Sequence, residues 1–422
     1  MDLRLIISII LAFSFIHTTI SSSAVECEYE LRKDTYNCYI KNATVLTSDT
    51  EHEIEGEHVN GYSASDVKKV FITKSIIHYL QPVIFNTFVN IEEFSSIESE
   101  IKELMPNALE SCAKLRIFII EDQELEFLPE NLFKNCQKLS ELTIKAQLSV
   151  LVPDTFHGLE NTLEILDLSG NQIMTVTDSY FKGLIRLTSL NLGSNVINEF
   201  DSAAFNDLTS LVELNLMGNL LTQSIIPANL FENLKNLLIL DLRINLINDL
   251  TADWFRNLTA LEVLDLSRND IDELRPNVFV PLGNLKFLYL DENNLETLQP
   301  EPFGQHESLI VLTVDDNKIQ SINLKFFDKF PNIEYFHAEN NVCIDGYLSA
   351  HEEPINFGDK EVSDVLTACY SYSDAVKLGE NEYLKWVWIG LGSAGGAFVL
   401  LVVLVLIVRK LRNRNNKITV NV

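Results

Sequence analysis

A hydrophobic pattern that recurs every 24 residues constrains the fold of this chain more than any other feature of its sequence. The repeats begin at residues 67, 91, 115, 139, 163, 187, 211, 237, 261, 285, 309 and 333. Ten of the eleven intervals are 24 residues and one is 26. Because repeats extend one core instead of starting new ones, we expect a single solenoid between residues 67 and 341.

The order of residues within one repeat predicts a strand followed by a return segment. Leu264 and Leu266 alternate with Asp265, as expected for a short strand with one buried face. The apolar residues that turn the chain back over the same core are Ile271, Leu274, Phe279 and Leu282. No single copy can bury its apolar side alone, so neighbouring copies must stack and their strands must form a parallel sheet.

The ninth place of most repeats is an asparagine. These residues are Asn171, Asn195, Asn219, Asn245, Asn269, Asn293, Asn317 and Asn341. An inward-pointing amide survives burial only when it hydrogen-bonds the backbone, so we interpret this column as a structural ladder between coils. The first four copies have Ser75, Ser99, Gln123 and Gln147 there, and the fourth has its central Phe156 shifted by one place. A less regular N-terminal third is therefore expected.

Two clear copies run from Leu187 to Ile197 and from Leu261 to Ile271, and both fit L-x-x-L-x-L-x-x-N-x-L. Over roughly residues 67–341 the chain resembles the extracellular, 24-residue class of the leucine-rich-repeat superfamily, which includes Toll-like receptor ectodomains and insect single-pass surface and immune proteins. The resemblance implies an α/β solenoid of about twelve repeats, a horseshoe with a parallel concave sheet and a cysteine-bonded cap at each end.

Both ends of the sequence predict passage through a membrane. Residues 1–24 contain Arg4, an apolar run of about a dozen residues and a final Ala24, which indicates a cleaved signal peptide. The alternative, an uncleaved anchor, requires a longer apolar run. Residues 386–408 carry no charge and are predicted to span the bilayer, since nothing after them could cover a buried core helix.

The last segment, residues 409–422, is basic and is expected to remain in the cytoplasm. The prediction is a single-pass, type I protein of the plasma membrane with an extracellular N-terminus. Gly392 and Gly396 form a small-residue face on the predicted span, which suits close approach of two helices and a homodimer.

Six cysteines in an exported chain favour disulfides. They fall into three pairs that are close in sequence: Cys27 with Cys38, Cys112 with Cys136, and Cys343 with Cys369. By resemblance, the first and last pairs suit an N-terminal cap at 25–66 and a C-terminal cap and stalk at 342–385, although the family's C-terminal flank usually has four cysteines. Cys112 and Cys136 occupy the same core position in adjacent turns, as a bridge or as buried free thiols.

The chain has 60 acidic and 32 basic residues, a net charge of -28, which argues against nucleic acid as a partner. Asn42 and Asn257 each begin an N-x-Thr triplet and are predicted glycosylation acceptors. The eight histidines show no metal-ligand spacing, and the sequence has neither a phosphate-binding loop nor a nucleophile elbow. We therefore expect no catalysis, no metal and no cofactor.

Side chains at the second, third, fifth, seventh and eighth places of each strand should project from the concave sheet. The candidate contact residues are Ile239, Asp241, Val263, Asp265, Phe287, Tyr289, Asp291, Val311, Asp315, Tyr335 and His337. Aromatic side chains contribute much of the energy of interfaces, and carboxylates around them would steer a basic protein. The alternative is an ordinary solvated face.

Three functions remain open from the sequence. The first is a receptor or co-receptor for a secreted protein or a microbial ligand, for example in innate immunity. Because its tail of 14 residues is too short to fold into a signalling domain, such a receptor would need a signalling partner. The others are a homophilic or heterophilic adhesion protein and a passive structural or decoy ectodomain.

Overall fold

The structure is a computed structural model that describes residues 25–48, 52–323 and 325–349, together with residues 355, 366, 368 and 369. The predicted signal peptide, membrane helix with Gly392 and Gly396, and cytoplasmic tail lie outside these residues, as does most of the predicted stalk. Among the residues that the structure describes, no helix is long and apolar enough to cross a bilayer.

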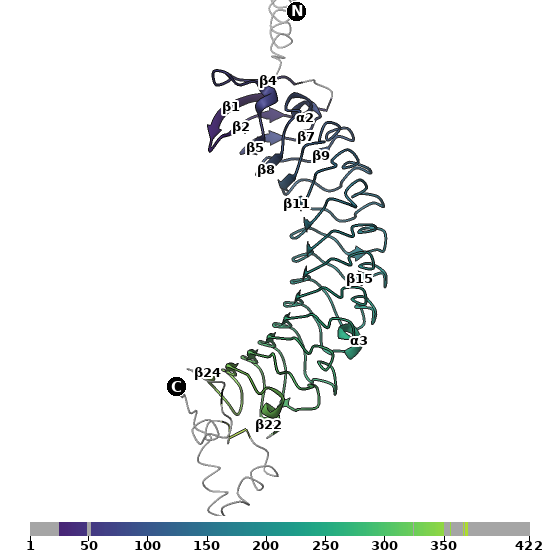
Figure 1. The fold of residues 1–422 in the computed structure, drawn as a ribbon, viewed down its shortest axis with the longest axis vertical. Coiled ribbons are helices and arrows are strands. Elements are labelled where there is room, and N and C mark those ends of the chain that lie inside the picture. The colour runs from purple at the N-terminus through teal and green to yellow at the C-terminus, as the bar shows by residue number, and fades with distance from the viewer. Residues whose placement is uncertain are drawn as a thin grey trace, which may run out of the picture. The chain divides into compact units, whose positions relative to one another are not determined.

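The chain divides into two compact units, Met1–Leu214 and Asn215–Val422, here called unit 1 and unit 2. Each unit is a stack of coils, and its strands lie along one side of the stack while turns lie along the other (Figure 1). We number the coils by the first residue of their repeat, so that coil 261 begins at Leu261. Strand β16 (Glu213–Asn215) contains the boundary between the units.

Unit 1 begins with a hairpin that serves as the first layer of the sheet. Strands β1 (Val25–Arg32) and β2 (Thr35–Lys41) are antiparallel, and β1 also pairs with β4 (Ile54–Glu55). The second strand of the hairpin then pairs in parallel with β5 (Lys69–Thr73). The predicted N-terminal cap therefore covers the end of the core by extending the same sheet.

The following coils of unit 1 add one parallel strand each. The strands are β8 (Glu93–Ile97), β10 (Ile117–Glu121), β11 (Glu141–Lys145), β12 (Ile165–Asp167) and β14 (Ser189–Asn191). Their register is offset by one repeat: Phe118 pairs with Leu142, and Leu142 pairs with Leu166. This spacing confirms the predicted stacking of 24-residue coils.

Unit 2 continues the same pattern. Its parallel strands are β17 (Ile239–Asp241), β18 (Val263–Asp265), β19 (Phe287–Tyr289), β21 (Val311–Thr313) and β23 (Tyr335–His337). The last strand, β24 (Tyr347–Ser349), is antiparallel to β23. The change of direction marks the end of the repeats.

The return sides consist mostly of turns. Short parallel ladders there join β3 (Thr44–Val45) to β6 (Ile76–Ile77), β7 (Tyr79–Leu80) to β9 (Glu103–Leu104), β13 (Thr175–Val176) to β15 (Glu199–Phe200), and β20 (Thr297–Leu298) to β22 (Ser321–Ile322). The helical segments described are α2 (Val83–Thr87), α3 (Ala252–Phe255), η1 (Ala64–Asp66) and η2 (Phe327–Lys329). The fold is thus a parallel β-solenoid, with a smaller helical share than the predicted α/β class implies.

Each coil buries its leucines and one central phenylalanine. Leu264, Leu266 and Phe279 are fully buried in coil 261. Phe156, which the sequence places one position early, still packs between Phe133 and Phe181, with ring centroids 6.4 and 6.3 Å away. The irregular repeat therefore keeps its place in the core.

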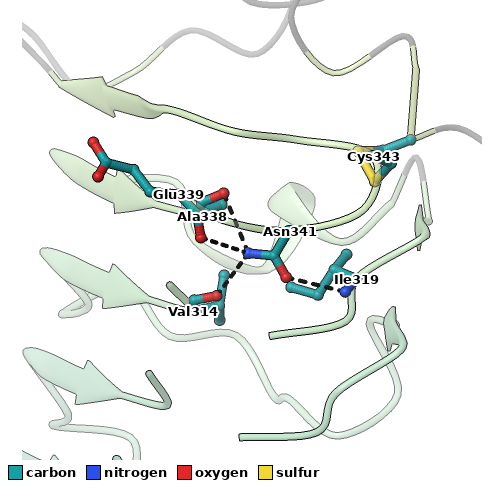
Figure 2. The surroundings of a disulfide bond; sticks show 7 residues. Val314, Ile319, Ala338, Glu339, Asn341 and Cys343 are labelled. Atoms are coloured by element: carbon teal, nitrogen blue, oxygen red, sulfur yellow. Dashed lines mark hydrogen bonds between the residues drawn. A yellow bond between two sulfur atoms is a disulfide. The ribbon is translucent and has the colours of Figure 1, made fainter. Parts of the chain in front are cut away.

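The predicted asparagine ladder is present. The Asn269 amide nitrogen donates to the backbone oxygens of Leu242 and Leu266, each at 3.0 Å, and its oxygen accepts from the Ile247 N–H group at 3.1 Å. Figure 2 shows the last of these residues, Asn341, whose amide nitrogen donates to the Val314 oxygen of the preceding coil at 2.9 Å. The amides join each coil to its neighbour.

The early copies fill this position less regularly, as the sequence predicts. Ser75 and Ser99 are buried as expected, but Gln123 and Gln147 are exposed. In coil 115 the buried Asp122 carboxylate accepts from the Ser99 N–H group at 3.0 Å. The long amides of Gln123 and Gln147 extend to solvent, and in coil 115 the shorter Asp122 carboxylate, one position before Gln123, reaches the buried backbone.

All three cysteine pairs are disulfides: Cys27–Cys38, Cys112–Cys136 and Cys343–Cys369. The bridge between Cys112 and Cys136 resolves the alternative of buried free thiols, since it joins the return segments of two adjacent coils. Cys343 follows the last ladder residue, as Figure 2 shows.

Candidate functional site

The candidate residues form two parallel rows on the sheet of unit 2. Strand register places Ile239, Val263, Phe287, Val311 and Tyr335 side by side at the third place of successive coils. The fifth-place row is Asp241, Asp265, Tyr289, Thr313 and His337. Residues two places apart along a strand project from the same face roughly 6.6 Å apart, so an apolar row runs beside a polar one. We call these two rows, with Asp291 and Asp315, the sheet-face patch.

These side chains are accessible to a partner. Tyr335 is 41% exposed and Ile239 is 36% exposed. The other predicted contact residues are half-buried, whereas Thr313, which the prediction omitted, is buried. Every predicted contact residue lies on the same face of the sheet, as the alternation in sequence indicates.

Several carboxylates of the patch already bind the chain's own backbone. Asp265 accepts from the Ser267 N–H group at 3.0 Å, and Asp241 accepts from the Arg243 N–H group at 3.1 Å. Asp291 accepts from the Thr313 hydroxyl at 2.5 Å and from the Asp315 N–H group at 2.9 Å. These residues therefore hold the turns after the strands, a role that the sequence analysis did not assign to them.

Burial and mutual repulsion disfavour the ionised form of these carboxylates. Burial raises the pKa of Asp291, and the charge of Asp265 adds to the increase. Burial likewise raises the pKa of Asp315, with a further contribution from Asp291. Burial and the same two neighbours, Asp265 and Asp291, raise the pKa of Tyr289. A cationic group placed among them would relieve this repulsion.

The arginine side chains near the patch already form ion pairs with carboxylates of the chain. Arg243 forms an ion pair with Asp241 at 3.0 Å and lies 3.9 Å from Asp265. Arg268 pairs with Glu292 at 2.7 Å, on the turn after β18. Within the part of the chain that the structure describes, Asp291 and Asp315 form no ion pair. The end of the patch near β21 and β23 is accordingly its most negative part.

Four further residues extend the patch and were missed by the sequence analysis. The Tyr347 ring, on β24, stacks on His337 with centroids 5.3 Å apart. Leu220, on the turn of coil 211, and Ile244 and Leu246, on the turn of coil 237 that also holds Ile239, are each more than 40% exposed. Tyr347 lies beyond the last repeat, where periodicity gives no signal, while the aliphatic residues occupy places that elsewhere hold polar side chains.

Both predicted glycosylation acceptors belong to the described residues. Asn42 is exposed in a turn with a φ of 55°. The Asn257 amide nitrogen donates to the Glu232 backbone oxygen at 3.1 Å. Neither residue lies on the sheet-face patch, so a glycan at either position would leave the patch accessible.

Two sequence families match the chain. The leucine rich repeat family matches residues 161–221, 235–295 and 284–342, and the BspA type leucine rich repeat region (6 copies) matches residues 57–171. Together these matches span nearly all the observed coils. The chain belongs to the leucine-rich-repeat superfamily. Its predicted resemblance to the extracellular members of this superfamily is confirmed by solved structures of similar fold.

One of these structures is the Toll chain of the Drosophila Toll–Spatzle complex, at 22% identity and a TM-score of 0.55. That match covers 65% of this chain and 39% of Toll, so the chain spans less than half the length of this relative. The APL1 leucine-rich repeat domain is 19% identical, with a TM-score of 0.50 and coverage of 76% of this chain and 72% of that one.

A third structure is the FLRT2 domain in an octameric complex with Latrophilin 3 and Unc5D. It is 22% identical, has a TM-score of 0.51, and is matched over 61% of this chain and 78% of that one. None of the curated proteins matches the chain. At these identities the likeness shows a leucine-rich-repeat fold, and any partner must be inferred from the chain's own surface.

Proposed function

We propose that this leucine-rich-repeat protein is a cell-surface receptor or co-receptor that binds a basic extracellular protein through the sheet-face patch of unit 2. The observation that carries the proposal is the apolar row from Ile239 to Tyr335 beside a row of carboxylates whose charges repel one another. Aromatic and aliphatic side chains supply burial in such an interface, and the carboxylates select Lys and Arg side chains.

The proposal also uses the predicted membrane topology. A signal peptide at 1–24 and a span at 386–408 would place both units outside the cell, with the disulfides in an oxidising environment. An antibody tag at the N-terminus of the mature chain should then be accessible on intact cells, whereas a tag after Val422 should require permeabilisation. Equal access to both tags would contradict a type I orientation.

The contact itself is tested by removing both central aromatic side chains. Cells that express the full chain are treated with a short-range crosslinker, and captured extracellular proteins are compared between wild type and the Phe287→Ala, Tyr289→Ala double variant. We expect capture of a basic protein to fall at least about tenfold, because truncation of central aromatic residues typically costs 2 kcal/mol or more.

A matched control uses the same two places in another coil. Ile117 and Ile119 occupy the third and fifth places of coil 115 in unit 1 and are also half-buried. The Ile117→Ala, Ile119→Ala variant should capture the same protein as wild type. Equal capture by the Phe287→Ala, Tyr289→Ala variant would place the contact elsewhere on the chain.

Homophilic adhesion is distinguished by a separate measurement. Cells that express the chain are mixed with unlabelled cells of the same kind, and aggregates are counted. A receptor for a basic soluble protein should not aggregate cells, because two acidic sheet-face patches on facing cells repel each other. Aggregation that depends on Phe287 and Tyr289 would favour adhesion instead.

A further inference from the structure

A second surface, on unit 1, has charged and apolar side chains in an order that is complementary to the same surface of a second copy. It lies on the flank that follows the strands and includes Lys102, Phe127, Val150, Val152, Met174 and Glu199, which we call the flank patch. Its four apolar side chains are 48, 58, 37 and 52% exposed, in the order Phe127, Val150, Val152, Met174. We propose that two copies of this chain associate through the flank patch, related by a two-fold axis near Val150.

The residues of the flank patch lie on five successive coils. Their strands β8, β10, β11, β12 and β14 are neighbours in the sheet. On the flank itself, the Gln147 N–H group donates to the Leu125 oxygen at 2.9 Å, and the Gln172 N–H group donates to the Leu148 oxygen at 2.8 Å. Phe127, Val150 and Met174 therefore lie on three coils in direct contact.

Exposed apolar side chains of this size are unusual at this place in the repeat. The corresponding places of neighbouring coils carry Lys102 and Glu103 on one side and Asn198 and Glu199 on the other. The short flank strands also stop at β9 and resume at β13, so the apolar side chains lie where the flank ladder is interrupted. A contiguous apolar patch within a polar rim is typical of an interaction site.

The order of residues along the flank identifies a second copy as the partner. Lys102 belongs to coil 91 and Glu199 to coil 187, and these coils lie two positions on either side of coil 139, which holds Val150. A two-fold axis at coil 139 would bring Lys102 of one copy opposite Glu199 of the other. Two-fold contacts use the same surface on both copies, which this order satisfies.

The apolar residues follow the same symmetry. The axis brings Phe127, on coil 115, opposite Met174 of the second copy, on coil 163, and sulfur–aromatic contacts are favourable. Val150 and Val152 meet their own counterparts at the axis. The dimer therefore has two ion pairs at its rim, with one residue of each pair from each copy, and one shared apolar centre.

Charge also opposes association of two copies through the acidic surfaces of the chain. A net charge of -28 makes two copies repel wherever carboxylates dominate, whereas Leu148 to Pro153 at the centre of the flank patch contains no charged residue. Coils 91 to 187 contain no N-x-Ser/Thr triplet, so no N-linked glycan would cover them. A basic partner would be drawn to the acidic sheet face of unit 2 and gain little from this neutral centre.

The role of the two rim residues, Lys102 and Glu199, can be tested by charge reversal because both side chains are exposed. Among the described residues Lys102 forms no ion pair, and Glu199 accepts a 3.3 Å hydrogen bond from the Thr175 hydroxyl. In cells that co-express two differently tagged full-length chains, we measure how much of one is recovered with the other. Lys102→Glu in both chains should reduce recovery at least about tenfold, since it places like charges opposite each other. Glu199→Lys in both chains should do the same.

The decisive sample mixes the two variants. When one chain carries Lys102→Glu and the other carries Glu199→Lys, both rim pairs are again attractive, and recovery should return to the wild-type level. Failure of the mixed pair to exceed either variant alone would overturn the two-fold arrangement, as would wild-type chains that are not recovered together. Delivery of each variant to the cell surface confirms that it folds.

A crosslink locates the axis independently. Val150→Cys should form a disulfide between copies, seen as a band of twice the mass that disappears on reduction, because residues near a two-fold axis meet their own counterparts. Thr297→Cys, an exposed residue at the equivalent flank place of coil 285, is the matched control and should remain a monomer. Equal dimer bands would overturn the proposed axis. Phe287→Ala, Tyr289→Ala chains should still associate, which separates this test from that of the proposed function.

Discussion

The buried amides show how single residues determine whether adjacent coils remain joined. Asn269 is 6% exposed and makes hydrogen bonds to both its own coil and the preceding one. Asn269→Ala would leave a backbone N–H group and two carbonyl groups without this partner, at a cost of roughly 1–3 kcal/mol for each group that stays dry. We expect a clear decrease in the denaturant midpoint of the variant, measured by circular dichroism.

Asn294→Ala provides the control for this measurement. Asn294 follows the ladder residue Asn293, is half-buried, and is engaged only through its backbone N–H group, which donates to the Ile271 oxygen. Its substitution should change stability by less than about 0.5 kcal/mol. A similar loss in both variants would contradict the assignment of stability to the ladder.

His306 predicts how stability depends on pH. Its ring is 1% exposed, packs against Phe303 and Phe330, and burial lowers its pKa below the ordinary value. The unfolded chain therefore takes up a proton more readily than the folded one, so stability falls as the pH drops below about 6.5. His306→Leu should reduce the shift in melting temperature between about pH 7.5 and pH 5.5. An unchanged shift would mean that other groups cause the pH dependence of stability.

The contribution of Asp291 to stability depends on pH in the opposite direction. Because its pKa is raised in the folded state, the protonated carboxyl group favours the fold and its ionised form opposes it. The stabilisation by the protonated group is therefore lost as the pH rises through the raised pKa. Asp291→Asn should be at least as stable as wild type at pH 7, since an amide can keep the bonds to Thr313 and Asp315. Its capture of a basic partner should nevertheless fall, and unchanged capture would show that the charge is not used.

At the scale of elements, the sequence predicts strands far better than the segments between them. Alternation around residues such as Leu264 marks each strand because one face must be buried, and the fixed spacing of the repeats then determines the register. The role of Asp122 could not be predicted, since periodicity does not reveal which polar side chain reaches a buried N–H group. Tyr347 was missed because β24 lies outside the repeats.

The bridge between coils 91 and 115 adds a prediction at this scale. Cys112 and Cys136 are fully buried and 24 residues apart. Replacing both with Ala should lower the free energy of unfolding of unit 1 by about 2–4 kcal/mol, as the open chain gains conformational freedom. Chemical denaturation of the variant, compared with wild type under oxidising conditions, measures the change. Equal midpoints would show that neighbouring coils are held together without the bridge.

For the whole molecule, the solenoid implies that disturbances remain local. Each coil contacts mainly its neighbours, so stability is a sum of short-range terms. In the Asn269→Ala variant, amide hydrogen exchange should accelerate in coils 237 to 285, and less in coils 67 to 115 of unit 1. Uniform acceleration throughout the chain would indicate that it unfolds as one cooperative body.

The same architecture explains why the contact residues were only partly predictable. Repeat register identifies every outward position of the sheet, and all the predicted residues are found there. It does not reveal that carboxylates such as Asp265 also hold turns, or that exposed aliphatic residues such as Leu246 extend the patch. Those features depend on contacts between coils, which differ from one repeat to the next.

The last strand has a consequence for solubility. A stack of parallel strands ends in an edge that can template a further strand, and chains with such an edge tend to grow into fibres. Because β24 is only three residues long, it presents a short edge, and short edge strands limit pairing with another chain. This short strand thus limits growth of the sheet from chain to chain, and a chain lacking it should scatter light at concentrations where the intact chain stays clear.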